Sequence, residues 1–420
     1  MKIYSHTFGI VACIAALSSC IHTETVPIQD AERTVIVYIA GENSLSGNAI
    51  QNINQMEQGY KSTMGNLIVY ADINNGRNPA ILKIKHDESS EIKSDTVVRF
   101  STPLNSADPT VMHSVLTTII EKYPAKTFGL ILWSHGTGWL PSVGYSSRTE
   151  AEINTENDIP PTAGYGWLSP AGYTLNTKWF GQDGNNKMDI WQFEEAIPDN
   201  TFDYIMFDAC LMGSTEVAWE LRKKTDYLLA APTEVIDAGF PYTTIVPLLF
   251  ANTDVPTTLN AVAQDFYDYY NKQTGAYRSA SIAVYYLPAL ENLAAVTKIV
   301  ILNNLPTSMN YHFDELQRLD YSLIDGGKIP VLYDFINFLE NNFPNDDVLE
   351  IYDKLRKVVV YERHTEIFIN FNLVSVCGLG TYVPRDYSSS AYEGYFNYLN
   401  SYYRNREFAQ AFGFNFLILD

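Results

Sequence analysis

Two short motifs in this sequence place reactive side chains directly after apolar runs. His135 follows the run Gly129–Ser134 and is itself followed by Gly136. Cys210 comes two residues after Asp208, the last residue of the run Tyr204–Asp208. A thiolate is a strong nucleophile, and an imidazole can accept and return a proton near neutral pH. If the fold brings both side chains together, the pair suits attack on a carbonyl group by a thiol.

Each motif also has a plain structural interpretation. A histidine that ends a strand can simply bond a carbonyl, and a free cysteine is often a buried core residue. Asp208 could cap the helix that we expect over Gly213–Lys223. The dipole of that helix would in turn lower the pKa of the Cys210 thiol. Taken together, the two motifs favour chemistry over packing.

The elements that must position these residues follow an alternating pattern. Short β-branched and apolar runs predict buried strands, and segments with apolar residues at helical spacing lie between them. This alternation predicts an α/β fold with a mostly parallel central sheet and helices on both faces. The carboxyl ends of parallel strands form a binding crevice, so both motifs should meet there. The expected strands are Thr34–Ala40, Asn66–Asp72, Gly129–Ser134, Tyr204–Asp208 and Tyr227–Ala231.

Helix caps and a change in composition organise the rest of the chain. We expect Ser44 to cap the first helix, and Asp108 to cap the second with Pro109 in its first turn. Residues 33–250 would form the core and 251–420 a helix-rich C-terminal part. Its strands, expected at Ser281–Tyr286, Ile367–Asn372 and Leu379–Val383, could return to the core sheet.

The N-terminus is typical of a targeting segment. A lysine and a short apolar run precede Leu17-Ser18-Ser19-Cys20, which predicts a signal peptide over residues 1–19. The sequence before Cys20 resembles a bacterial lipoprotein box, so Cys20 would carry lipid and residues 20–32 would be a tether. The alternative is a plain signal peptide with an incidental cysteine. We therefore expect an exported protein held on a bacterial membrane, at the periplasmic face or cell surface.

Charge and missing motifs exclude several classes of function. The 420 residues carry a net charge of −20, which argues against nucleic acid as a partner and against direct binding to anionic lipid. Membrane contact would come through the lipid alone. No HExxH, GxSxG or Walker motif occurs, so zinc protease, serine hydrolase and nucleotidase chemistry lose support. Cys210 and Cys377 would remain after processing and could form a disulfide.

The motif His135–Trp139 and the segment Phe207–Arg222 together resemble the clostripain family of cysteine peptidases, within the caspase-like group of α/β folds. The resemblance implies that Cys210 attacks the scissile carbonyl and that His135 transfers the proton. The N–H groups of Gly136 and Cys210 would form the oxyanion hole. Asp208 would lie at the base of a pocket for Arg or Lys, and Asp237 is a weaker candidate for the same pocket.

Family members are often cut between the His and Cys motifs by the enzyme itself. The polar interval Leu140–Lys178 contains Arg148, our first choice for such a cut, and Lys178. The alternative is an uncut lid. The resemblance allows calcium as a cofactor, because calcium use is known in the family. We interpret Asp183–Glu194 as a turn and an amphipathic helix, however, so we assign no metal-ligating residues. Glu362, His364 and Glu366 alternate as on a solvated strand edge.

The sequence therefore predicts an exported, lipid-anchored cysteine endopeptidase that cleaves peptide or protein substrates after Arg or Lys. Two other functions stay open. One is a catalytically silent surface protein that binds peptides on the same fold. The other is a thiol hydrolase or transferase acting on a different amide.

Overall fold

The computed structural model describes residues 31–61, 65–140, 168–169, 173–174, 180–251, 253–309, 311–321, 329–386 and 393–419. The expected signal peptide lies outside these residues, as do Cys20, Arg148 and Lys178. Within the described ranges, no helix has both the length and the apolar character needed to cross a membrane.

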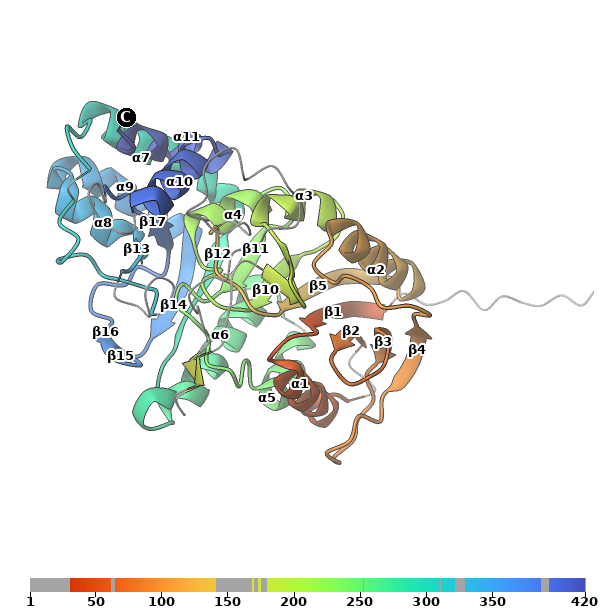
Figure 1. Ribbon diagram of the computed structural model, residues 1–420. Coiled ribbons are helices and arrows are strands. Elements are labelled where there is room, and N and C mark those ends of the chain that lie inside the picture. The colour runs from red at the N-terminus through yellow and green to blue at the C-terminus, as the bar shows by residue number, and fades with distance from the viewer. Residues whose placement is uncertain are drawn as a thin grey trace, which may run out of the picture.

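A nine-stranded central sheet runs through the molecule (Figure 1). Its strand order is β14-β12-β11-β10-β5-β1-β2-β3-β4. The five central strands, from β11 to β2, pair in parallel, and antiparallel strands extend both edges. The strands are β1 (Ala31–Gly41), β2 (Asn66–Ile73), β3 (Ala80–Lys83), β4 (Asp95–Arg99), β5 (Ala125–Trp133), β10 (Tyr204–Asp208), β11 (Tyr227–Ala230), β12 (Ser281–Tyr286) and β14 (Val359–His364). The predicted α/β fold with a mostly parallel central sheet is confirmed.

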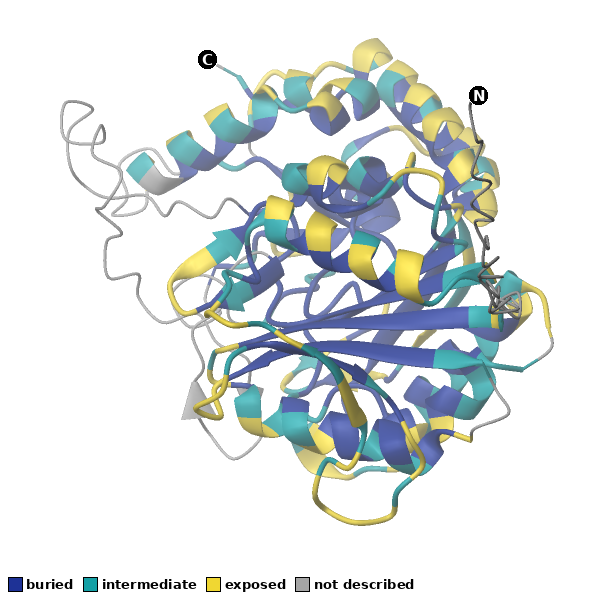
Figure 2. Ribbon diagram, turned by 90° about the vertical axis from the view of Figure 1, so that its right-hand side faces the viewer, coloured by how far each residue is buried: buried dark blue, intermediate teal, exposed yellow. Residues whose placement is uncertain are grey.

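Helices cover both faces of this sheet. In Figure 1, α1, α5 and α6 lie below the sheet, α2, α3 and α4 lie above it, and α7 to α11 gather beside α4. Figure 2 shows the central strands as a dark blue layer between helices whose outer sides are exposed. The helices are α1 (Ser46–Gly59), α2 (Pro109–Lys122), α3 (Phe193–Ala196), α4 (Thr215–Leu221), α5 (Tyr242–Leu249), α6 (Val255–Asn271), α7 (Leu290–Asn303), α8 (Phe335–Asn342), α9 (Asn345–Val358), α10 (Glu393–Arg404) and α11 (Glu407–Phe412).

One of the two predicted helix caps is confirmed. The Asp108 carboxylate accepts hydrogen bonds from the N–H groups of Thr110 at 2.8 Å and Val111 at 3.3 Å, at the start of α2. The predicted cap at Ser44 is wrong. Helix α1 begins at Ser46 with Leu45 at the cap position and no side-chain cap. The Ser44 hydroxyl instead lies 3.0 Å from Nε2 of His135, so it contacts the histidine ring and not the N-terminus of the helix.

The C-terminal strands divide between the central sheet and small sheets. β12 and β14 extend the central sheet at one edge. The expected strand Ile367–Asn372 is not continuous. Its chain turns at Ile369, where φ is +53°, and forms the hairpin of β15 (Ile367–Phe368) and β16 (Phe371–Asn372). β17 (Gly380–Tyr382) pairs with β13 (Leu332–Asp334). The domain boundary near residue 250 stays a prediction.

Two residues tie the sheet to the C-terminal helices. Trp139, from the segment after His135, packs on Tyr382 and Tyr403 with ring centroids 4.5 and 4.8 Å away. Glu216, in the helix after Cys210, is fully buried. Its Oε1 accepts hydrogen bonds from the Tyr382 N–H at 2.9 Å and the Tyr403 hydroxyl at 3.0 Å. Both segments that follow the reactive residues are therefore anchored in the same aromatic cluster.

We expect Glu216→Ala to lower the free energy of unfolding by about 3 kcal/mol, because buried donors on Thr381, Tyr382 and Tyr403 lose their acceptor. Urea unfolding followed by tryptophan fluorescence would measure the loss. The matched control is Glu350→Ala on the exposed side of α9, which should change stability by less than about 0.5 kcal/mol. Equal effects of the two substitutions would contradict this account.

Candidate active site

Strand register brings the two sequence motifs to one end of the sheet. Asp208 of β10 is the register partner of Trp133 of β5, and the Ser134 N–H donates to the Asp208 carbonyl oxygen at 3.4 Å. His135 and Cys210 each follow this pair by two residues, so they leave adjacent parallel strands at the same height. The close approach needs a glycine, since a Cβ atom on Gly136 would lie only 2.7 Å from the Cys210 carbonyl oxygen.

His135 is completely buried behind this edge. Its Nε2 lies 3.0 Å from the Ser44 hydroxyl oxygen, in the loop that follows β1. Burial, assisted by the nearby positive charge of Lys187, lowers the pKa of His135 to about 3. The imidazole is therefore neutral at physiological pH, which is the form that can accept a proton.

The thiol of Cys210 is also buried, with 1% of the residue exposed. Its Sγ donates to the Val235 carbonyl oxygen at 3.6 Å and accepts from the Val235 N–H at 3.1 Å. Burial, together with the charge of Glu234, raises the pKa of the thiol well above its usual value. The expected lowering by a helix dipole is wrong, because α4 begins only at Thr215 and Cys210 lies outside its first turn.

The neutral thiol of Cys210 and the neutral imidazole of His135 set a condition on the chemistry that this edge of the sheet can perform. Neither group is ionised at rest, so attack by this sulfur would require the thiol proton to pass to a base such as His135. The thiol is also covered by other groups, so a substrate could reach Sγ only after those groups moved. The described arrangement is that of a covered site.

Asp208 places a buried carboxylate two residues before the thiol. Its Oδ2 accepts hydrogen bonds from the Tyr242 hydroxyl at 2.9 Å and the Phe240 N–H at 3.2 Å, while Oδ1 is buried without a hydrogen-bond partner among the described residues. Burial raises the pKa of Asp208 to about 7, and the two hydrogen bonds offset part of that rise. Asp208 does not cap α4, because Ser214 holds that position. An unpaired buried carboxylate oxygen suits a cationic group.

The loop Ala231–Pro241 lies over this carboxylate. A Cβ atom on Gly239, where φ is +68°, would lie 2.8 Å from Oδ2 of Asp208, so only glycine fits. Asp237, the second sequence candidate for the pocket, belongs to the same loop and is partly buried. Its carbonyl oxygen accepts from Nδ2 of Asn48 in α1 at 2.8 Å. Gly239, Phe240 and Tyr242 thus touch the Asp208 carboxylate, while the Asp237 backbone is held by α1.

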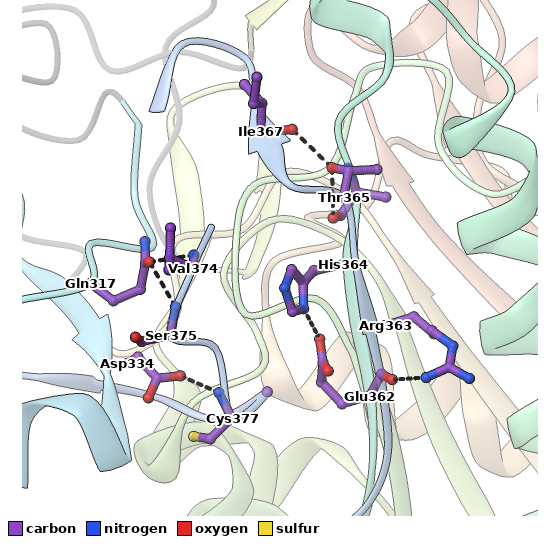
Figure 3. Close-up of polar contacts among 12 residues, drawn as sticks. Gln317, Asp334, Glu362, Arg363, His364, Thr365, Ile367, Val374, Ser375 and Cys377 are labelled. Atoms are coloured by element: carbon purple, nitrogen blue, oxygen red, sulfur yellow. Dashed lines mark hydrogen bonds and ion pairs between the residues drawn. The ribbon is translucent and has the colours of Figure 1, made fainter. Parts of the chain in front are cut away.

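Cys377, the second thiol, occupies a different environment. Both cysteines are free, so the disulfide that we considered is wrong. The Cys377 N–H donates to Asp334 Oδ2 at 2.7 Å and its Sγ to the Leu379 carbonyl oxygen at 3.5 Å. Figure 3 shows this thiol near the edge strand β14, where Glu362 and His364 contact each other at 2.6 Å. Glu366 lies beyond the strand and pairs with Arg278.

An acidic cluster at the same end of the sheet was missed by the sequence reasoning. Glu42, Asp72 and Asp183 each offer a carboxylate oxygen, and these atoms all lie within 4.8 Å of one another. Burial and the charges of the other two raise the pKa of Asp72 to about 7. The Ser106 N–H donates to Asp183 Oδ2 at 2.6 Å. An all-oxygen donor set suits a hard cation, so this cluster could hold a metal ion.

The expected turn is present at Gly184 and Asn185, but a strand follows it where we expected the helix. Asp183 directly precedes this turn. It ends β8 (Phe180–Asp183), which forms a hairpin with β9 (Asn186–Met188). A short 3₁₀ turn and α3 follow this hairpin. β8 lies beside the His motif, since the Gly181 N–H donates to the His135 carbonyl oxygen at 3.2 Å. The interval between the two motifs thus contributes directly to the site.

Several contacts of this site carried no clear signal in the sequence. Glu234, Val235 and Tyr242 reach the site through tertiary folding of the chain after β11. The type and position of Ser44 did carry a signal, but we interpreted that signal as a helix cap. It follows the end of β1, at the same sheet edge as His135, but its residue type also suits a helix cap. A polar residue that follows a parallel strand can line the crevice at the sheet edge or cap the next helix.

An α/β sheet with histidine and cysteine on adjacent strand ends is the arrangement of a thiol hydrolase. The model of the clostripain family matches residues 37–157 and 162–412. Clostripain of Hathewaya histolytica is 24% identical over 270 residues, covering 56% of this chain and 46% of that protein. The match thus spans less than half the length of this relative.

Solved structures agree with this family over most of the chain. An inactive zymogen C11 protease from Parabacteroides distasonis has a TM-score of 0.69 and 27% identity, covering 91% of this chain and 98% of that one. A secreted C11 cysteine protease from Bacteroides thetaiotaomicron, in complex with an irreversible peptide inhibitor, has a TM-score of 0.68 and 28% identity, covering 91% and 99%. The chain belongs to the clostripain family of cysteine proteases.

We expect Gly136→Ala to destabilise the protein by about 1–3 kcal/mol, since its methyl group would meet the Cys210 carbonyl oxygen at 2.7 Å. Thermal and urea unfolding would measure the change. The control is Gly47→Ala in α1, where a Cβ atom meets nothing within 4 Å and helix propensity should add about 0.5–1 kcal/mol. If Gly136→Ala proved as stable as the parent, the two motifs would not be packed as described.

Proposed function

We propose that this chain is an endopeptidase that cleaves peptide bonds after Arg or Lys with Cys210 and His135. The observation that carries the proposal is the common strand end of β5 and β10, where both residues leave the sheet at the same height. The buried carboxylate of Asp208, two residues before the thiol, supports selection of a cationic side chain. Asp237 in the neighbouring loop is a secondary contributor to that pocket.

The proposed reaction begins when the substrate cation pairs with Asp208. Cys210 Sγ then attacks the scissile carbonyl carbon while its proton passes to His135. The N–H groups of Gly136 and Cys210 stabilise the negative charge on the carbonyl oxygen. His135 returns the proton to the leaving amine as the peptide bond breaks and a thioester remains. Water then attacks the thioester carbonyl as His135 takes its proton. The C–S bond breaks, the carboxylic acid product leaves, and His135 returns the proton to the Cys210 sulfur.

Cys210→Ala should abolish hydrolysis of an arginyl peptide, because the methyl group of alanine cannot act as a nucleophile. His135→Ala should lower kcat by about 10²–10⁴, the usual contribution of a proton-transferring side chain. Initial rates on a fluorogenic peptide would show both losses. Cys377→Ala is the matched control and should leave the rate unchanged, since Cys377 lies in another environment. Activity that depends on Cys377 instead would reverse the assignment.

Asp208→Asn should lower kcat/KM for Arg and Lys substrates by about 2–4 kcal/mol of transition-state binding, with little effect on a substrate that has a neutral side chain. Asparagine keeps the size of the side chain and removes the charge. Comparing kcat/KM for matched Arg and Ala peptides separates an effect on the binding pocket from an effect on the Cys210–His135 dyad. Equal rates on the two peptides in the parent enzyme would end the idea of a cation pocket.

The same carboxylate should make selectivity depend on pH. Burial raises the pKa of Asp208 to about 7, so the carboxyl group is protonated below that value and ionised above it. The ratio of Arg to Ala cleavage should therefore rise as pH increases through about 7, while the dyad affects both substrates alike. In Asp208→Asn the ratio should stay low and flat across the range.

A second candidate is a silent surface protein that binds peptides on this fold. The burial of both His135 and Cys210 favours it, because neither side chain is accessible in this arrangement. The peptide assay separates the two functions. A silent protein would bind an arginyl peptide without a product that depends on Cys210.

We further propose export and lipid anchoring through Cys20, and these rest on the N-terminal sequence. A secreted relative with the same fold supports export. Cleavage by the enzyme itself at Arg148, or at Lys178, stays a prediction from the sequence.

We also propose calcium as the ion for the cluster of Glu42, Asp72 and Asp183, whose oxygen-only donors suit it. Calcium at about a hundredfold excess over its Kd should stabilise the parent by about 2.7 kcal/mol. Asp72→Asn should remove this gain in a thermal unfolding series with calcium or a chelator. Asp314→Asn, at an exposed position, should keep it. An unchanged melting temperature in the parent would exclude calcium binding here.

A further inference from the structure

We infer that Ser44 is a positioning residue for the proposed reaction, which holds His135 through its Nε2 atom while the ring exchanges a proton with Cys210. The inference rests on the proposed function of the dyad. Its starting observation is the 3.0 Å separation between the Ser44 hydroxyl oxygen and His135 Nε2. Ser44 is an exposed residue of the loop between β1 and α1, whereas His135 is fully buried.

The loop that carries Ser44 is fixed on both sides by side-chain hydrogen bonds. Asn43 Nδ2 donates to the carbonyl oxygens of Ala40 at 3.0 Å and Gln182 at 2.8 Å, and Asn43 Oδ1 accepts from the Leu45 N–H at 2.9 Å. Ser46 Oγ donates to the Gly41 carbonyl oxygen at 2.5 Å and accepts from the Asn74 N–H at 2.8 Å. Ser44 is therefore held against the ends of β1, β2 and β8.

This rigidity distinguishes Ser44 from an ordinary surface serine. A hydroxyl group can donate to a neutral ring nitrogen and can accept from a protonated one. When His135 receives the thiol proton, both ring nitrogens carry hydrogen, and Nε2–H can donate to Ser44 Oγ. A hydrogen bond to a charged group is stronger than one to a neutral group, so Ser44 supports His135 most in its protonated form.

The geometry also assigns roles to the two ring nitrogens. With Nε2 directed at Ser44, Nδ1 is the atom that must exchange the proton with Cys210. The positive charge of Lys187 on β9 opposes protonation of His135, as does burial. An acceptor at Nε2 counters both effects. Ser44 thus acts on the proton transfer step through its contact with His135.

The test compares Ser44→Ala with Ser44→Thr, which keeps the hydroxyl group. Ser44→Ala should lower kcat on an arginyl peptide by about 10- to 100-fold with KM nearly unchanged, because one hydrogen bond to a charged group is lost. The limb of the pH profile that reports His135 should move to lower pH. Ser44→Thr should recover most of the rate. Ser101→Ala, at another exposed serine, is the matched control and should behave as the parent.

A second measurement separates this inference from the proposed function. Ring ¹⁵N shifts of His135 can be recorded in Cys210→Ala, with and without Ser44→Ala, and need no catalysis. A change at Nε2 on loss of the hydroxyl group supports the contact even if the parent cleaves nothing. The inference would be overturned if Ser44→Ala kept the kcat and the pH profile of the parent. Unchanged Nε2 shifts would overturn it as well. If Ser44→Ala and Ser44→Thr both lost activity and both had a lower melting temperature, Ser44 would be needed for the stability of the fold and not for positioning His135.

Discussion

Parallel pairing of β5 with β10 is the constraint on which the site depends. Backbone hydrogen bonds fix the register at Trp133 and Asp208, and the two chains then leave the sheet side by side. A shift of one residue would reverse the direction of every side chain on one strand. The buried apolar residues of both strands oppose such a shift, because it would exchange their packing faces. The stability of the core therefore sets the alignment of His135 with Cys210.

Desolvation is the common cause of the electrostatics at this edge. It disfavours the charged form of each group, so it lowers the pKa of His135 and raises those of Cys210, Asp208 and Asp72. Burial therefore favours the neutral form of each of these four groups at rest. In the proposed reaction, a cationic substrate would add charge at Asp208 and the transferred proton would add charge at His135. Both groups are buried, and electrostatic interactions are stronger away from water, so each of these charges would matter more than at the surface.

The C-terminal region takes part in this arrangement. Trp139 follows the His motif and Glu216 follows the Cys motif, and both are anchored on Tyr382 and Tyr403. The two reactive segments thus share a support as well as a sheet. Packing at Tyr382 and Tyr403, far along the chain, therefore supports both segments together.

The sequence by itself determined the alternating strands, the sheet edge at which His135 and Cys210 end, and the Asp108 cap. These features depend on local periodicity and residue type, which can be read directly from the sequence. Tertiary structure alone decided that Ser44 turns to His135 and away from α1, that Cys210 is buried outside α4, and that Glu42, Asp72 and Asp183 converge. Each of these depends on which distant segments meet, and on how much water they exclude. A hydroxyl or carboxylate has several possible partners along the chain, and only packing selects among them.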